Sequence, residues 1–288
     1  MNSLYHTNHR LTYFLLVGFF NSHLIVKDLH MAVVVNLNAD MAEGFGAYDI
    51  GNDDEILRII KSASVACGLH AGDATIMRNV VSKASENGVS IGAHPGFNDL
   101  WGFGRRKIDM SAHDLENLVA YQIGALQAMA KYANAEVTHV KPHGALNNMA
   151  AVNADYALAV GRAIKAVDPG LIYVALAGSK MQWAAEELGL PLAREGFCDR
   201  QYDDDGNLTS RKEPGSVLKD PELALKQVVR MVTQGEIVSR SGKVISCKVD
   251  TLCVHGDEPT AIALAARVRQ GLEGAGVKIV TLPEVLKN

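Results

Sequence analysis

From Met31 onward, the chain alternates between short apolar runs and longer segments in which apolar residues recur every three or four positions. The short runs predict buried strands, whereas the longer segments predict amphipathic helices. We expect strands at 33–38, 63–67, 89–93, 137–141, 172–176, 192–195, 251–254 and 277–280. We expect helices at 53–62, 74–87, 112–132, 154–167, 179–188, 221–234 and 259–273. Since parallel strands need long crossover connections, this alternation predicts a parallel sheet in an α/β domain.

The alternation of side chains within the strands distinguishes a closed barrel from an open sheet. In the first strand, Val35 and Leu37 point to one face, while Asn36 and Asn38 point to the other. An open sheet covered by helices on both sides is apolar on both faces, but the interior of a barrel leads to a polar mouth. The pattern therefore favours a closed β/α barrel.

Two segments interrupt the alternation. Residues 196–219 are rich in Asp, Gly and Pro and predict a long loop, of a length that often serves as a lid or binding segment. Residues 236–240 and 243–248 flank Ser241-Gly242 and predict an inserted hairpin. No linker or low-complexity stretch divides the chain, so we expect residues 31–288 to form a single barrel domain.

Residues 1–30 do not match the rest of the chain. Their apolar run, Leu11 to Phe20, is well short of the ~20 residues that a membrane span needs. No small-x-small cleavage site follows Phe20, as a signal peptide would require. We interpret residues 1–30 as a disordered leader or a start-codon artefact.

The composition excludes several classes of function. The 28 Lys and Arg residues against 32 Asp and Glu residues give a net charge of −4, which argues against a nucleic-acid-binding face. Four cysteines without CxxC spacing are typical of a reducing compartment, so we expect a cytoplasmic protein. The chain contains neither a P-loop motif nor an HExxH zinc motif.

Reactive side chains gather where the predicted strands end. Four of the six histidines beyond residue 30 occupy such ends, and each is followed within two residues by glycine. The carboxyl ends of parallel barrel strands meet at one mouth, where the active sites of such barrels lie. We therefore select as candidate catalytic residues Asp40, Glu43, His70, His94, Lys141, His143 and His255.

Further polar residues near these ends could bind a substrate or a phosphate group: Asn38, Asp73, Arg105, Arg106, Asp199, Arg200 and Asp257. The paired arginines suit a bidentate grip on a carboxylate or phosphate, although a solvated charged loop fits the same pattern. Asp73 fits equally well as the N-cap of the helix at 74–87.

Two expectations concern charge in the predicted mouth. Asp40, His70 and His94 could ligate a divalent cation through oxygen and imidazole. Lys141 points inward, and a buried ammonium must face a carboxylate, such as Asp40 or Glu43, or an anionic ligand. Of these partners, we expect the ligand.

Six ordered motifs resemble the LamB/YcsF family, which supplies the A subunit of bacterial 5-oxoprolinases. The matching stretches are NLNADMAEGFG (36–46), ACGLHAGD (66–73), GAHPGFNDLWGFGRR (92–106), VKPHGALNN (140–148), CDRQYDDDGNLTSRKEPGSVL (198–218) and CVHGDEP (253–259). The chain departs from the family at several positions, among them Asn36 in place of Asp and Ser64 in place of Asn.

The resemblance implies an irregular seven-stranded β/α barrel, similar to that of polysaccharide deacetylases and glycoside hydrolases. It also implies hydrolytic opening of the lactam 5-oxoproline to L-glutamate, driven by ATP with Mg²⁺, together with B and C subunits. Phosphoryl transfer to the amide oxygen would need cations such as Lys141, Arg105 and Arg106, while the carboxylates and histidines would move protons.

Two other interpretations remain open from the sequence. One is a metal-dependent deacetylase or amidohydrolase that acts without ATP through Asp40, His70 and His94. The other is a non-catalytic subunit that only presents substrate or holds partners. This second interpretation predicts full activity of the complex when His94 or Lys141 is replaced by Ala.

We predict that a chain starting at Met31 is soluble and has the same thermal midpoint as the full chain, because the composition changes at Met31. Thermal unfolding of the two chains, followed by circular dichroism, checks this. Aggregation of the shorter chain alone would mean that residues 1–30 belong to the fold.

Overall fold

The computed structural model of the protein describes residues 33–255 and 261–287. The leader that we expected at residues 1–30 and the candidate residue Asp257 lie outside these described residues. Within the described ranges, none of the helices combines the length and the apolar character needed to span a bilayer.

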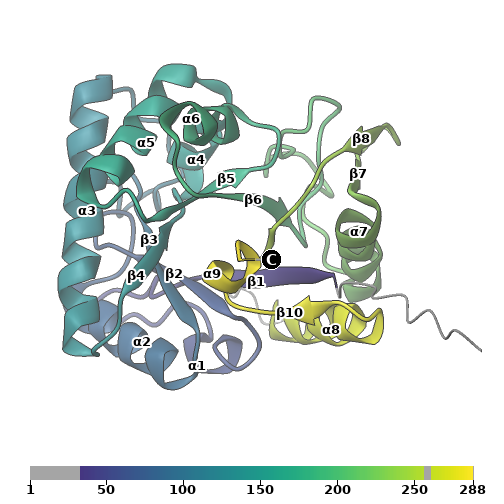
Figure 1. The fold of residues 1–288 in the computed structure, drawn as a ribbon, viewed down its shortest axis with the longest axis horizontal. Helices are drawn as coiled ribbons and strands as arrows, with labels where there is room; N and C mark the ends of the chain where they lie inside the picture. Colours follow the sequence, from purple (N-terminus) through teal and green to yellow (C-terminus); the bar gives the residue numbers. More distant parts are fainter. Residues whose placement is uncertain (1–32, 256–260, 288) are drawn as a thin grey trace, which may run out of the picture. The chain divides into compact units, whose positions relative to one another are not determined.

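Seven parallel strands close into a barrel, as the alternation of side chains predicted (Figure 1). Their order around the ring is β1-β2-β3-β4-β5-β6-β9, and β9 pairs back onto β1. The strands are β1 Val34–Met41, β2 Ser62–Ala66, β3 Ser90–His94, β4 Val137–Val140, β5 Ile172–Leu176, β6 Leu192–Phe197 and β9 Thr251–Val254.

The strand expected at 277–280 is present as β10 (Lys278–Ile279), but it is not one of the seven barrel strands. It pairs with Val34 and Val35, at the start of β1, whereas β9 pairs with the four residues that follow, Asn36 to Ala39. One edge of the eight-residue strand β1 therefore pairs with both β10 and β9, so β10 lies beside the closed ring without being part of it.

Helices connect the strands and surround the ring (Figure 1). The described helices are α1 Asp53–Ile56, α2 Ala74–Glu86, α3 Ala112–Tyr132, α4 Gly144–Val152, α5 Ala154–Val167, α6 Lys180–Leu188, α7 Pro221–Gln234, α8 Ala261–Gly274 and α9 Leu282–Val285. The N-cap considered at Asp73 is confirmed, and the side chains of Ser111, Asn153 and Asp220 likewise accept from first-turn backbone N–H groups, at the starts of α3, α5 and α7.

Three helices differ from what the sequence pattern predicted, among them the short α9, which was not expected. The helix expected at 53–62 ends at Ile56, because the chain must turn and enter β2 at Ser62. The helix α4 was not expected, because Gly144, Asn147 and Asn148 are poor helix formers. The predicted hairpin is confirmed as β7 (Glu236–Val238) and β8 (Val244–Ser246), which pair antiparallel.

Polar side chains fill the interior of the barrel along β1. Asn36 donates from Nδ2 to Ser62 Oγ and to the carbonyl of Val280, both at 2.8 Å, and its Oδ1 accepts from Thr251 at 2.7 Å. Asn38 donates to Thr251 Oγ1 at 2.8 Å. At this end, the backbone N–H of Leu282 in α9 also donates to Ser62 Oγ, at 3.2 Å.

The opposite faces of the strands are apolar and pack against the helices. Val35, Leu37 and Ala39 of β1 are completely buried in the main hydrophobic cluster. Along β1 the base of the interior is thus polar and hydrogen-bonded, while Leu282 of α9 packs against Ile172, Val174 and Ala193 of β5 and β6. The residues that the sequence placed at the carboxyl ends lie at the opposite mouth.

Candidate active site

The seven candidate catalytic residues all lie at or just after the carboxyl ends of barrel strands. Asp40 and Glu43 come from the end of β1, His94 is the last residue of β3, and Lys141 directly follows β4. The others follow β2, β4 and β9 at His70, His143 and His255. Parallel topology therefore gathers side chains that are far apart along the chain.

The buried ammonium group of Lys141 lies at the centre of this mouth. Its Nζ is 2.9 Å from Asp40 Oδ1 and 2.9 Å from Glu195 Oε1. It also donates to Asn38 Oδ1 at 3.0 Å and to Cys253 Sγ at 3.1 Å. Burial opposes the charge, but Asp40, Cys253 and Glu195 together raise the pKa of Lys141 well above its ordinary value.

These contacts identify the partners that the chain itself supplies to Lys141. Asp40, which was considered from the sequence, and Glu195, which was not, both lie within ion-pair distance of its ammonium. Glu43, the other partner considered from the sequence, lies instead among the histidines.

Glu195 was not among the candidates selected from the sequence. It lies in β6, where it and Ala193 share one face of the strand and Arg194 points to the other. Arg194 makes a two-pronged ion pair with Asp250, so the two neighbouring charges have different partners. A lone acidic residue on the inward face of an apolar strand was the signal that could have identified Glu195.

Asp40 lies between Lys141 and His94. Its Oδ2 is 3.3 Å from His94 Nε2, while the other ring nitrogen of His94, Nδ1, lies 2.7 Å from the carbonyl oxygen of Lys141. Burial alone would raise the pKa of Asp40, but the charges of His94 and Lys141 lower it well below its ordinary value. Asp40 therefore holds a negative charge at the mouth.

Glu43, His70, His94 and His143 form a second group beside Asp40. The rings of His70 and His143 stack with centroids 3.8 Å apart, and Glu43 Oε1 lies 3.5 Å from His143 Nδ1. Burial, together with the charge of Asp40, raises the pKa of Glu43. Burial lowers the pKa values of His70 and His143, so both rings stay neutral.

Close packing at Gly104 holds the stacked rings in place. Its φ of +61° lies in the left-handed region, and a Cβ there would lie 2.7 Å from atoms of both His70 and His143. Glycine is needed for both reasons, so the loop at 99–106 can lie directly on the imidazoles.

His255 belongs to a separate pair on the other side of Asp40. Its Nδ1 lies 2.7 Å from Asp199 Oδ2, and its Nε2 lies 3.0 Å from Arg211 of the long loop. Burial would lower the pKa of His255, but the charge of Asp199 and the hydrogen bond to it raise the pKa overall. Burial would raise the pKa of Asp199, but the charge of His255 lowers it, and the pKa of Asp199 is lowered overall.

The candidate binding residues are not all gathered in the mouth. Asp73 caps α2 and also accepts from the backbone of Gly46, and Arg106 forms an ion pair with Asp99. Arg200 donates to the carbonyl of Thr209, and burial lowers its pKa to about 10. Arg105 lies over the ring of Phe103 at 5.0 Å, close enough for its charge to act on Glu43 and His70.

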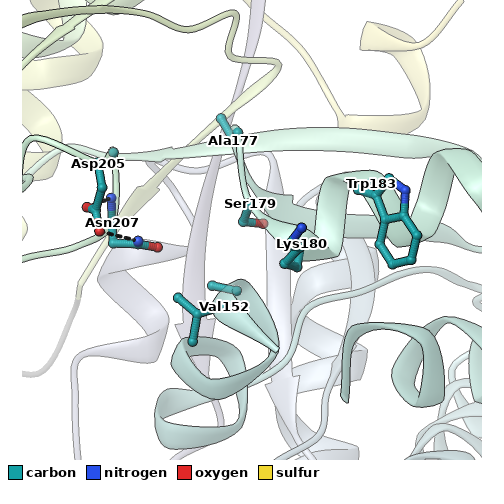
Figure 2. A pocket seen from close by; sticks show the side chains of 10 residues that line it. Val152, Ala177, Ser179, Lys180, Trp183, Asp205 and Asn207 are labelled. Carbon is teal, nitrogen blue, oxygen red and sulfur yellow. Dashed lines mark hydrogen bonds between the residues drawn. The ribbon is translucent and has the colours of Figure 1, made fainter. Parts of the chain in front are cut away.

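A cavity of about 390 Å³ lies beside the carboxyl end of β5, away from the histidines. Figure 2 shows Asp205 and Asn207 of the long loop on one side of it and Ser179 and Lys180 at the start of α6 on the other. None of the described candidate residues lines this cavity. It therefore does not identify the reacting groups.

The model of the LamB/YcsF family matches residues 35–287, which include every described strand end of the mouth. The chain belongs to the LamB/YcsF family. A relative in this family, the 5-oxoprolinase A subunit of Rhodopseudomonas palustris, is 54% identical over 246 residues, which are 85% of this chain and 96% of that protein. The resemblance inferred from the six motifs is confirmed.

One solved structure agrees with this family membership, and a second shares the fold. The lactam utilization protein from Thermus thermophilus has 42% sequence identity and a TM-score of 0.82, with 86% of this chain and 99% of that chain covered. A putative cellobiose-phosphate cleavage protein from Enterococcus faecalis has 13% identity and a TM-score of 0.54, with 87% and 98% covered. The second likeness concerns the fold alone.

We predict that Lys141→Met lowers the free energy of unfolding by about 3–5 kcal/mol, because it leaves two buried carboxylates without their cation. Urea unfolding without ligands measures this. The matched control is Lys83→Met, which removes an exposed pair with Asp54 and should cost less than about 1 kcal/mol. Equal effects of the two substitutions would contradict the structural ion pair.

We predict that Asp199→Asn lowers the pKa of His255, since burial and Arg211 then act without the opposing carboxylate. Titration of the His255 ring by NMR measures the shift, with Asp205→Asn in the same loop as control. A raised pKa stabilises the fold at low pH, and this stabilisation is lost as the pH rises through the folded pKa. That loss should disappear in Asp199→Asn. An unchanged His255 titration would show that Asp199 does not stabilise the proton on His255.

Proposed function

We propose that this protein opens the lactam ring of 5-oxoproline by hydrolysis to give L-glutamate, coupled to hydrolysis of ATP, as the A subunit of an enzyme with B and C subunits. The observation that carries the proposal is the 54% identity to the A subunit of a 5-oxoprolinase over nearly its whole length. The lactam utilization protein supports a lactam as the substrate. Because that relative is named as one subunit of its enzyme, it also supports an assembly of several chains.

The chemistry explains why such a reaction needs ATP. A five-membered lactam is a stable amide whose ring closes readily, so its opening must be coupled to a favourable step. Transfer of the γ-phosphoryl group to the amide oxygen releases ADP, and water then adds to the activated carbon. The C–N bond breaks as nitrogen takes a proton, and a second water molecule releases phosphate from the acyl phosphate.

Asp40 fits the role of the base that accepts a proton from water. Its side chain is 14% exposed at the mouth, whereas that of His94 beside it is 1% exposed. A water molecule at the mouth can therefore reach Asp40. Lys141 and His94 hold the carboxylate from two sides, which fixes its direction.

His255 fits the role of the acid that protonates the ring nitrogen. Its pKa is raised where that of Asp40 is lowered, and opposite shifts in neighbouring groups are the pattern of an acid–base pair. A nitrogen of His255, an oxygen of Asp40 and Cys253 Sγ all lie within 4.8 Å of one another. Arg211 donates to His255 Nε2, so this nitrogen must be released from Arg211 and take up a proton before it can act as the acid.

Cations near the mouth fit the charge that develops during phosphoryl transfer. Lys141 lies behind Asp40, and Arg105 lies near Glu43 on the loop that covers the histidines. ATP would bring Mg²⁺ as a further cation. The guanidinium of Arg106, on the same loop, faces Asp99.

The proposal is tested by following glutamate release from 5-oxoproline in a mixture of this chain, the B and C subunits and Mg-ATP. We expect release only when all three subunits and ATP are present. Release without ATP would favour an amidohydrolase, and undiminished release without this chain would exclude it from the reaction. Full activity with His94→Ala would indicate a non-catalytic subunit.

We predict that Asp40→Asn lowers turnover in this assay by at least about 100-fold, the usual contribution of a positioned base. Its effect on the melting temperature should be small, because Lys141 keeps Glu195 as a partner. Asp54→Asn, an exposed carboxylate on α1, is the matched control and should keep full turnover. A large loss of stability with Asp40→Asn would make Asp40 a structural residue instead.

A further inference from the structure

Glu43, His70, His94 and His143 come from four successive strand ends and are all buried. Each offers one nitrogen or oxygen atom, and these four atoms all lie within 4.8 Å of one another. We call this set the Glu43–histidine cluster. Asp40 borders this set without belonging to it: its Oδ1 pairs with the ammonium of Lys141, and its Oδ2 lies 3.3 Å from His94 Nε2.

The backbone determines which ring nitrogens of two of these histidines carry protons. His94 Nδ1 lies 2.7 Å from the carbonyl oxygen of Lys141, and His143 Nε2 lies 2.8 Å from that of Phe103. A carbonyl oxygen only accepts, so both of these nitrogens must be N–H donors. When both rings are neutral, His94 Nε2 and His143 Nδ1 therefore bear lone pairs.

These two lone-pair nitrogens face each other at 3.0 Å. Two acceptors without a proton between them repel, so the neutral arrangement requires something positive at that point. Metal-bound histidines are typically held in this way, with the other ring nitrogen donating to a backbone carbonyl.

His70 and Glu43 add two more donor atoms that lack partners. Among the described residues, neither ring nitrogen of His70 has a hydrogen-bond partner, and neither does Glu43 Oε1. His70 Nε2 and Glu43 Oε1 are 3.7 Å apart, too far for a hydrogen bond. Buried polar atoms are nearly always satisfied, so these unpartnered atoms point to a ligand.

The spacing of the donor atoms fits a metal ion, provided that one of the stacked rings of His70 and His143 turns, because an imidazole nitrogen binds a metal in the plane of its own ring. A tetrahedral ion with bonds of about 2.0–2.1 Å separates its ligand atoms by roughly 3.3–3.4 Å. The distances here are 3.0 Å between His94 and His143, 3.5 Å between His143 and Glu43, and 3.7 Å between His70 and Glu43. Three imidazoles and one carboxylate favour a zinc-like transition ion over Mg²⁺ or Ca²⁺, which prefer oxygen ligands.

We propose that Glu43, His70, His94 and His143 bind one divalent transition-metal ion of the zinc class. The set differs from the ligands expected from the sequence, which were Asp40, His70 and His94. Glu43 takes the place of Asp40, which forms an ion pair with Lys141. The proposal concerns metal content and stands apart from the lactam reaction. Its test therefore does not depend on substrate or on partner subunits.

The test uses the full chain, prepared without a histidine tag, stripped with a chelator and titrated with Zn²⁺ against a chromophoric competitor. We expect one tightly held ion per chain, and an X-ray absorption spectrum with about 2.0–2.1 Å nitrogen and oxygen distances and scattering from three imidazoles. Because the spectrum is recorded on the unaltered chain, it does not depend on whether variants fold.

Variants then identify the ligands. His70→Ala and His143→Ala should each weaken Zn²⁺ binding by at least about 100-fold, the upper range for disturbing a metal site. His113→Ala, which removes an exposed histidine from α3, and Asp40→Asn should both keep the ion. Circular dichroism shows that each variant is folded.

Three results would overturn the proposal. They are less than a tenth of an equivalent of Zn²⁺ retained, a spectrum without imidazole scattering, and unchanged affinity in folded His70→Ala and His143→Ala. Loss of the ion in Asp40→Asn with retention in His143→Ala would instead identify the ligand set expected from the sequence. A cluster that binds no ion would leave a shared proton between His94 and His143 as the positive charge.

Discussion

The ammonium group of Lys141 is the constraint on which the rest of the mouth depends. A buried cation is stable only among anions and acceptors, and here it has carboxylates from β1 and β6 as well as Asn38 and Cys253. These contacts cross the interior of the barrel and connect β1, β4, β6 and β9. They also separate the satisfied polar base around Asn36 from the reactive residues above it.

The position of Lys141 divides the titratable groups into two sets. On one side of Asp40, burial keeps His70 and His143 neutral and Glu43 inclined to hold a proton. On the other side, Asp199 stabilises the charged form of His255. The carboxylate of Asp40, fixed by Lys141, thus lies between the Glu43–histidine cluster, whose ring nitrogens and carboxylate could bind a metal, and the His255–Asp199 pair, which can hold a proton.

The sequence predicted those parts of the structure that depend on local pattern. Periodicity indicated the strands and the closed barrel, and the order of strand ends indicated His70, His94, His143 and Asp40 as neighbours. Neither could indicate Glu195 as a partner of Lys141, because that contact depends on the register between β6 and its neighbours. Asp73 and Arg106 look reactive in sequence, but local backbone amides and Asp99 satisfy them.

Exposure determines from which side a substrate can reach these groups. His70, His94 and His143 are almost completely buried beneath the loop at 99–106, whereas the side chains of Asp40 and His255 are 14% and 12% exposed. The long loop that contains Asp199 and Arg211 borders this more open edge. A small ring such as a lactam can therefore reach Asp40, His255 and Glu43, whose side chain is 10% exposed, before it reaches the three histidines of the Glu43–histidine cluster. This arrangement explains why the acid–base groups and the metal-type donors occupy one mouth without competing for the same space.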